Sequence, residues 1–211
     1  MIVLGIELSS RQGSLALVKD GVLLAEKKWI GERVRHNVLF QTMETILKET
    51  GLSYRDITLY AVGRGPGSFS GMRMAFAVAQ ALALPGRIEV RAVSSGAALA
   101  LAAARETGAK QIAVVGDARR GQVWYGTFQT LDGQMVKLSN DWVLVSYDEI
   151  KVPEGTLVIS PEAERLTHYF PDIGTPRFPL ASDVAKLALA GSEPLEPLYM
   201  HPPVFIEPKY I

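Results

Sequence analysis

Residues 61–73 read AVGRGPGSFSGMR, a stretch that predicts a strand, a glycine-rich turn and a helix that opens at Gly71. The glycines and the proline within residues 65–71 supply the backbone conformations that a tight strand-to-helix connection needs. Free N–H groups and the positive end of the helix dipole would favour an anion or a carboxylate there. The alternative is an ordinary strand-to-helix turn that is rich in glycine.

Two familiar catalytic loops are excluded by their spacing. A nucleotide-binding P-loop has two glycines five residues apart, followed by Lys and then Ser or Thr, and this segment has no such Lys. A hydrolase nucleophile elbow needs Gly-x-Ser-x-Gly, a pattern that the serines of this loop do not form.

The elements predicted around the loop belong to an α/β fold. Apolar runs at 1–8, 13–19 and 22–29 predict three strands, and Asp20-Gly21 is typical of the turn of a β-hairpin. The order βββαβαβα is typical of a ribonuclease-H-like domain, in which helices cover a mixed sheet. The elements that complete this order are a helix over 33–49, a strand over 57–63, a helix over 71–84, a strand over 88–93 and a helix over 95–107.

The second half of the chain repeats features of the first. Residues 111–117 predict a strand that ends in Asp117, as the first strand ends in Glu7, and Asp132-Gly133 repeats the earlier hairpin turn. A repeat distance of about 110 residues indicates two copies of one fold. The sequence therefore predicts a ribonuclease-H-like domain over 1–103 and a smaller, truncated copy over 104–211. The remaining elements are expected at 122–129, 134–145 and 156–160 as strands and at 161–170 and 182–190 as helices.

Composition restricts the function. The 211 residues include 22 basic and 22 acidic side chains and no cysteine, so we expect no extended phosphate-binding surface and no disulfides. Nucleic acid would be held by a partner. The chain has no apolar stretch of membrane-spanning length, and it enters a strand directly instead of a signal sequence. We therefore expect a soluble, cytoplasmic protein.

Three segments resemble the TsaB family, also called YeaZ, of the actin, sugar kinase and Hsp70 superfamily. The family's loop reads Gly-Arg-Gly-Pro-Gly-Ser-Phe-Thr-Gly-x-Arg, and Ser70 replaces its Thr here. The resemblance covers the first domain and continues to Gly126, and it is weak beyond about residue 150. The three segments are VLGIELSS at 3–10, GRGPGSFSGMRMAFAVAQALA at 63–83 and GDARRGQVWYG at 116–126.

This resemblance implies a noncatalytic subunit of the machinery that makes threonylcarbamoyladenosine at position 37 of tRNA. A TsaD-type transferase would be its partner and would carry out the reaction, and a TsaE-type ATPase would assist. The chain would meet tRNA only through the complex. A homodimer would compete with the heterodimer.

The helix over 71–84 indicates where a partner would bind. Only Arg73 and Gln80 are polar, so both sides of this helix are expected to be buried. A stripe of Met72, Ala75, Val78, Ala79 and Leu82 is predicted to face the sheet. The residues predicted to contact the partner are Arg73, Phe76, Ala77, Gln80 and Leu84, together with Arg35, His36, Gln41 and Thr42 of the preceding helix. The alternative is that other helices of the same chain cover this face.

Catalysis by the chain itself is disfavoured by particular residues. Kinases of this fold hold Mg²⁺ with acids at the positions of Glu7 and Asp117. Here Arg119 and Arg120 replace the small residues that would cradle phosphates, so Asp117 is expected to pair with an arginine. No catalytic residue and no cofactor are predicted, while weak or partner-shared ATP or ADP binding stays open. Candidate contacts to an anion or nucleotide are Glu7, Gly65, Gly67, Ser68, Ser70, Gly71 and Asp117.

Two enzymatic alternatives remain. An ATP-dependent phosphotransferase of the same fold is the runner-up. A metallopeptidase ranks lower, because TsaD-like proteins carry two histidines four residues apart, whereas His36 is followed at that distance by Phe40. No metal site is therefore predicted.

Overall fold

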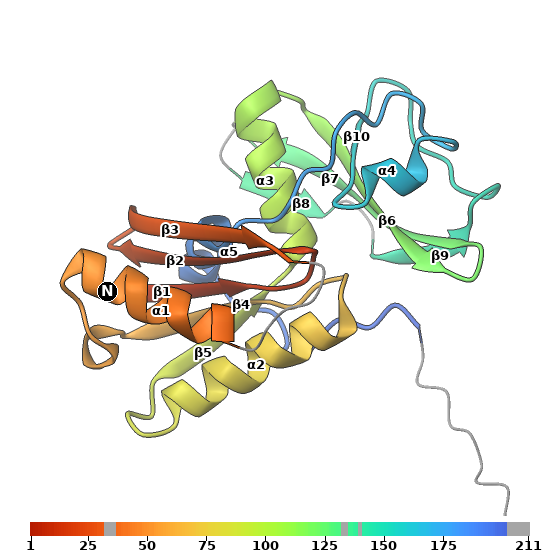
Figure 1. The fold of residues 1–211 in the computed structure, drawn as a ribbon. Helices are drawn as coiled ribbons and strands as arrows, with labels where there is room; N and C mark the ends of the chain where they lie inside the picture. The colour runs from red at the N-terminus through yellow and green to blue at the C-terminus, as the bar shows by residue number, and fades with distance from the viewer. Residues whose placement is uncertain (32–36, 132–134, 139–140, 202–211) are drawn as a thin grey trace, which may run out of the picture.

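The computed structural model describes residues 1–31, 37–131, 135–138 and 141–201. The chain forms two lobes, each built on a five-stranded sheet, so the predicted mixed α/β class is confirmed (Figure 1).

The first lobe contains a mixed sheet of strand order β3-β2-β1-β4-β5. Strands β1, β2 and β3 are antiparallel, and β4 and β5 run parallel to β1. Asp20 and Gly21, with φ of 49° and 82°, make the predicted hairpin turn between β2 and β3. The strands are β1 (Ile2–Glu7), β2 (Gln12–Lys19), β3 (Val22–Ile30), β4 (Leu59–Gly63) and β5 (Glu89–Val93).

Helices cover both faces of this sheet. On one face, α1 (Asn37–Thr50) and α2 (Phe69–Ala83) bury side chains such as Leu39, Ile46 and Ala79 against β1 and β2, while a short 3-10 helix (Tyr54–Asp56) precedes β4. On the opposite face, α5 (Ala181–Ala190) packs through Val184 and Ala188. The side of α2 that faces the sheet is therefore buried, and its opposite side could contact a partner.

Helix α3 (Ser95–Thr107) joins the lobes. Its N-cap is Ser94, whose hydroxyl accepts a hydrogen bond from Ala97 N at 3.1 Å. Its Ala98 packs with α5 of the first lobe, and its Leu99 and Ala103 pack on the second sheet. One helix thus contributes to the cores of both lobes (Figure 1).

The second sheet has the order β10-β6-β7-β8, and β9 also pairs with β7. Here the prediction needs two corrections: the expected strand at 134–145 is two strands that both pair with β7, and the expected helix at 161–170 is four residues long. Asp132-Gly133 lies outside the described residues. The elements are β6 (Gln111–Arg119), β7 (Gln122–Leu131), β8 (Met135–Leu138), β9 (Val143–Ser146), β10 (Leu157–Ile159) and α4 (Ala163–Leu166).

The carboxy-terminal part of the chain returns to the first lobe, because α5 packs on β1, β2 and β4. Gly5 in β1 allows this approach, since a Cβ at Gly5 would lie 2.3 Å from the carbonyl oxygen of Ala181. A division of the chain between residues 103 and 104 stays a prediction.

Candidate functional site

The glycine-rich loop is fastened to its surroundings by its own backbone. Gly65 N donates to the Ser95 hydroxyl at 3.0 Å, and Ser68 N donates to Ser9 O at 2.7 Å. Helix α2 begins at Phe69, two residues before the predicted start, because the Ser68 hydroxyl caps it by accepting from Gly71 N at 3.2 Å. The loop is therefore a rigid joint between β4, β1 and α2.

Two glycines of the loop are required by close packing on the end of β1. A Cβ at Gly71 would lie 1.9 Å from Leu8 O, and one at Gly67 would lie 2.1 Å from Ser9 O. Gly67 also has φ of 155°, which side chains rarely adopt. These glycines let the first turn of α2 rest directly on the backbone after β1.

Glu7 is buried beneath this loop. Its side chain is fully buried, its Oε1 accepts from Ser9 N at 2.5 Å, and its Oε2 has no hydrogen-bond partner within the described residues. A Cβ at Gly63 would lie 1.8 Å from Oε2. Burial raises the pKa of Glu7 above its ordinary value, against the opposing effect of Ser9, which favours the charged form.

Asp117 forms the predicted ion pair with an arginine. Its Oδ2 lies 3.0 Å from Arg119 and 3.3 Å from Arg165, and its Oδ1 accepts from the Tyr147 hydroxyl at 3.0 Å. Burial acts to raise the pKa of Asp117, but hydrogen bonds and these arginines outweigh it, so the pKa is lowered. Burial and the bond to Asp117 raise the pKa of Tyr147 to about 12. Asp117 is thus held as a carboxylate.

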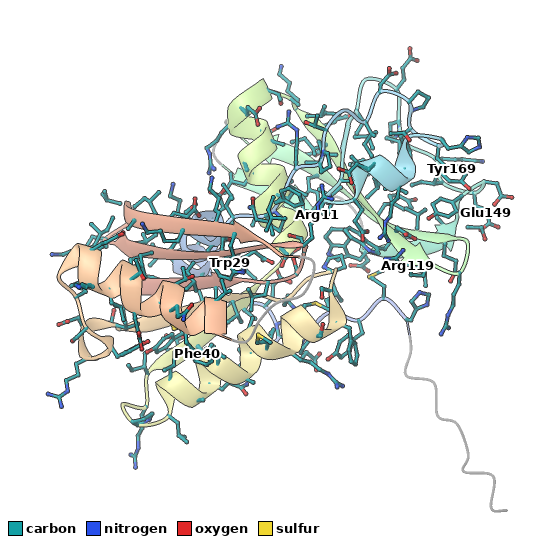
Figure 2. All side chains as sticks on the ribbon, viewed as in Figure 1. Arg11, Trp29, Phe40, Arg119, Glu149 and Tyr169 are labelled. Carbon is teal, nitrogen blue, oxygen red and sulfur yellow. The ribbon has the colours of Figure 1, made fainter. Side chains whose placement is uncertain are left out.

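A cleft of about 1510 Å³ separates the two lobes. Of the candidate anion or nucleotide contacts, Gly67, Ser68, Ser70, Gly71 and Asp117 line it, whereas Glu7 and Gly65 do not. Arg11 and Arg119 face this junction from opposite lobes (Figure 2). Arg11 spans the cleft, because its guanidinium donates to both carboxylate oxygens of Glu164 at 2.9 and 3.0 Å.

Helix α2 exposes a continuous flank on its far side. Arg73, Ala77, Gln80 and Leu84 are exposed as predicted, and the exposed fraction of Leu84 is 77%. The prediction for Phe76 is wrong, because this side chain is 5% exposed and belongs to the core. Phe76 lies four residues after Met72 and three before Ala79, both buried, so helical periodicity places it in the same inward stripe.

Helix α1 continues this surface less completely. Gln41 is exposed, and Thr42 is partly buried with its hydroxyl donating to Val38 O at 2.6 Å. Arg35 and His36 lie outside the described residues. Phe40, which sequence reasoning missed, is 47% exposed and lies in the first turn of α1 (Figure 2).

Two further aromatic residues were missed. Phe69, in the first turn of α2, is 54% exposed, and Tyr199 packs on it with ring centroids 4.9 Å apart. The sequence does indicate Phe69, because it is a large apolar residue among the small residues of the glycine-rich loop. Tyr199 carried no local signal, since its place depends on the return of the chain.

Two features are absent from the described residues. No group of three or more His, Asp or Glu side chains there is arranged to hold a metal ion. No described helix has the length and apolar character to cross a membrane.

Comparisons with known proteins identify the family. A family model described as TsaD, tRNA N6-adenosine threonylcarbamoyltransferase, matches residues 33–186. The chain is 34% identical over 129 residues to the tRNA threonylcarbamoyladenosine biosynthesis protein TsaB of Escherichia coli and 28% identical over 141 residues to that of Bacillus subtilis. These alignments cover 61% and 67% of this chain but only 55% and 61% of the relatives.

Solved structures agree. YeaZ from Pseudomonas aeruginosa superposes with a TM-score of 0.78 at 26% identity, covering 94% of this chain and 99% of that one. A second structure, described as an uncharacterized protein with similarity to peptidase YEAZ from the same organism, gives a TM-score of 0.80, also at 26% identity, covering 95% of this chain and 99% of that one. The chain belongs to the family that the TsaD model describes and, within it, to the TsaB (YeaZ) group.

Proposed function

We propose that this chain is a noncatalytic subunit of tRNA threonylcarbamoyladenosine synthesis that binds and activates a TsaD-type transferase. Membership of the TsaB group supports the pathway, since the relatives are named for this biosynthesis. The match to the TsaD model supports a partner of related fold, because paired relatives can meet through equivalent helices.

The observation that carries the proposal is the exposed flank of α2. Leu84 and Phe69 are mostly exposed at its two ends, and the stretch between them contains Ala77 and Ala81, which are also exposed. Alanines let another helix approach closely, and large exposed apolar side chains at both ends would gain by burial. Within the described residues, Tyr199 contacts this flank at its first turns, through Phe69 and Arg73.

The rest of the proposal follows from the same arrangement. Each lobe would be a ribonuclease-H-like copy, and the first would bind the partner. The transferase would hold tRNA, and a TsaE-type ATPase would dock on the assembled pair in the cytoplasm. The chain would have no cofactor of its own, and ATP or ADP would bind weakly or in a site shared with the partner. A homodimer would use the same flank and so exclude the transferase.

A phosphotransferase of this fold is the second candidate, supported by the cleft. Asp117 and Glu162 line it together, and Glu162 Oε2 accepts from Asp117 N at 2.9 Å. Burial raises the pKa of Glu162, as is common for an acid that moves protons. Arg119 and Arg165 on Asp117 weigh against it, because they occupy the carboxylate that would hold Mg²⁺.

Reconstitution distinguishes these functions. Purified transferase, threonylcarbamoyl-adenylate and tRNA are combined with and without this chain, and modified nucleoside is measured. Our proposal expects strong stimulation by the chain and no phosphoryl transfer by the chain alone. Turnover of ATP with a small acceptor, lost on Asp117→Ala, would instead establish the phosphotransferase.

A further inference from the structure

Residues 192–201, which we call the strap, run from the end of the first lobe across to the second. The strap starts along the edge of β5, where Glu193 N donates to Ala92 O at 2.8 Å and Glu193 Oε1 accepts from Ser94 N at 2.7 Å. Glu193 thus fixes the beginning of the strap through both its backbone and its side chain.

Arg64 of the glycine-rich loop fastens the middle of the strap. It is 8% exposed, and its guanidinium pairs with Glu193 at 3.2 Å and donates to Glu196 O at 3.0 Å. In return, Leu198 N donates to Arg64 O at 2.7 Å. The loop and the strap therefore hold each other in one arrangement.

Tyr199 is placed by these anchors against the exposed flank of α2. Its hydroxyl accepts from Arg73 Nε at 2.9 Å, and its ring packs on Phe69. Arg73 itself lies over Phe69, with its guanidinium carbon 4.0 Å from the ring centroid. We call these three residues the aromatic knob.

The far end of the strap is anchored on the second lobe. His201 Nε2 lies 2.8 Å from Ala118 O, near the end of β6. The strap is thus attached to both lobes, with Tyr199 between the two attachments. A contact residue held at both sides loses little conformational entropy when a partner binds.

We propose that the aromatic knob is part of the surface that docks on the partner and that the strap holds Tyr199 in its place there. This inference rests on the proposed function, with the TsaD-type transferase as the occupant. The knob is continuous with the exposed flank of α2, since Arg73 belongs to both. Tyr199 and Phe69 stay 39% and 54% exposed although they pack on each other, so a partner could still bury both rings. Tyrosine and arginine are also the residue types that most often dominate binding energy at interfaces.

The test measures the dissociation constant for the purified transferase with the full chain and three variants. Tyr199→Ala removes the ring and the acceptor for Arg73, and Tyr199→Phe removes only the hydroxyl. Tyr169→Ala is the control, because Tyr169 is 44% exposed and also stacks on a tyrosine, at 4.1 Å from Tyr147, but lies on the second lobe (Figure 2). Urea unfolding verifies that each variant is folded.

We expect Tyr199→Ala to weaken binding by about tenfold or more, Tyr199→Phe to weaken it less, and Tyr169→Ala to leave it unchanged. If the wild-type chain binds the transferase and Tyr199→Ala changes the dissociation constant by less than about twofold, the knob has no role in docking. The proposed function is then unaffected. Equal losses for Tyr199→Ala and Tyr169→Ala also overturn the role of the knob, because the effect would not be specific to the strap. Failure of the wild-type chain to bind the transferase overturns the proposed function itself.

Discussion

Arg105 of α3 and Asp183 of α5 form a bidentate ion pair, with N–O distances of 2.5 and 2.8 Å. The Asp183 side chain is fully buried, while that of Arg105 is 41% exposed. This pair ties the helix that joins the lobes to the helix that returns from the carboxy-terminal part of the chain. It therefore fixes a connection between segments 78 residues apart.

Arg105→Ala should destabilise the protein strongly, because it leaves the Asp183 carboxylate buried without its cation. Breaking a buried pair in this way costs about 3–5 kcal/mol. Lys27→Ala is the matched control, since it breaks the exposed pair with Glu49 at 2.7 Å and should cost at most about 1 kcal/mol. Urea unfolding of both variants measures the difference, and similar losses would show that the buried pair has no special role.

Local patterns predicted most elements of the first lobe. The Asp20-Gly21 turn and the cap Ser94 act within a few residues, so the sequence shows them directly. Helix α3 accordingly begins at the residue expected. The start of α2 was misplaced because Ser68, whose N–H bonds to Ser9 O just after β1, caps the helix two residues before the predicted start.

Long-range contacts were not predictable in the same way. Gly5 interrupts an apolar strand without a local reason, and its cause is Ala181, which packs on it from α5. The inward stripe of α2 was misassigned at Phe76 because a nearly uniform apolar helix gives a weak periodic signal. In the candidate site, the pairing of Asp117 was predictable from its neighbour Arg119, while the second arginine, Arg165, and the strap arrive from later segments.

Gly71→Ala should be destabilising although alanine favours helices. The new methyl group would meet Leu8 O at 1.9 Å, so the first turn of α2 must move away from β1. Overpacking of this kind costs about 1–3 kcal/mol. Gly191→Ala is the control, because nothing lies within 4 Å of its Cβ position and its φ of 175° suits any residue. Thermal unfolding compares the two, and an equally stable Gly71→Ala protein would contradict the required close packing.

Glu7 should make the protein less stable as pH rises. Its pKa is raised in the folded state, so between the ordinary value of 4.5 and the higher folded value the folded protein holds more protons than the unfolded chain. Stability is then lost with increasing pH across this window. Glu7→Gln removes the titration, so it should gain stability relative to wild type at pH 7.5 more than at pH 4.

Urea unfolding at the two pH values tests this prediction for Glu7. Glu162, with a raised pKa, contributes a slope of the same sign, whereas carboxyls with a lowered pKa, such as Asp117, contribute the opposite sign. The test therefore compares Glu7→Gln with wild type at each pH. Glu164→Gln is the control, because Glu164 is exposed and its pKa is lowered by the hydrogen bond to Arg11. A Glu7→Gln protein with the wild-type pH dependence would show that Glu7 does not titrate in this window.

Leu84→Glu should abolish tight binding to the transferase while leaving the monomer folded. Leu84 is 77% exposed, so the isolated chain tolerates a charge there, whereas a docked helix would bury it. Loss of an apolar contact worth about 1.5–3 kcal/mol alone weakens binding roughly tenfold to a hundredfold, and a buried charge adds to this. Ala77→Trp tests the same flank without charge, since its bulk would hold a second helix away.

Val22→Glu is the control for this flank, because Val22 is 65% exposed and lies at the start of β3, beside the hairpin turn. Sedimentation or calorimetry with the purified transferase measures each variant. Losses at Leu84 and Ala77 with normal binding by Val22→Glu would assign docking to the α2 flank. Normal binding by all three variants would place the interface elsewhere. An interface on this flank could not tolerate both a charge at position 84 and an indole at position 77.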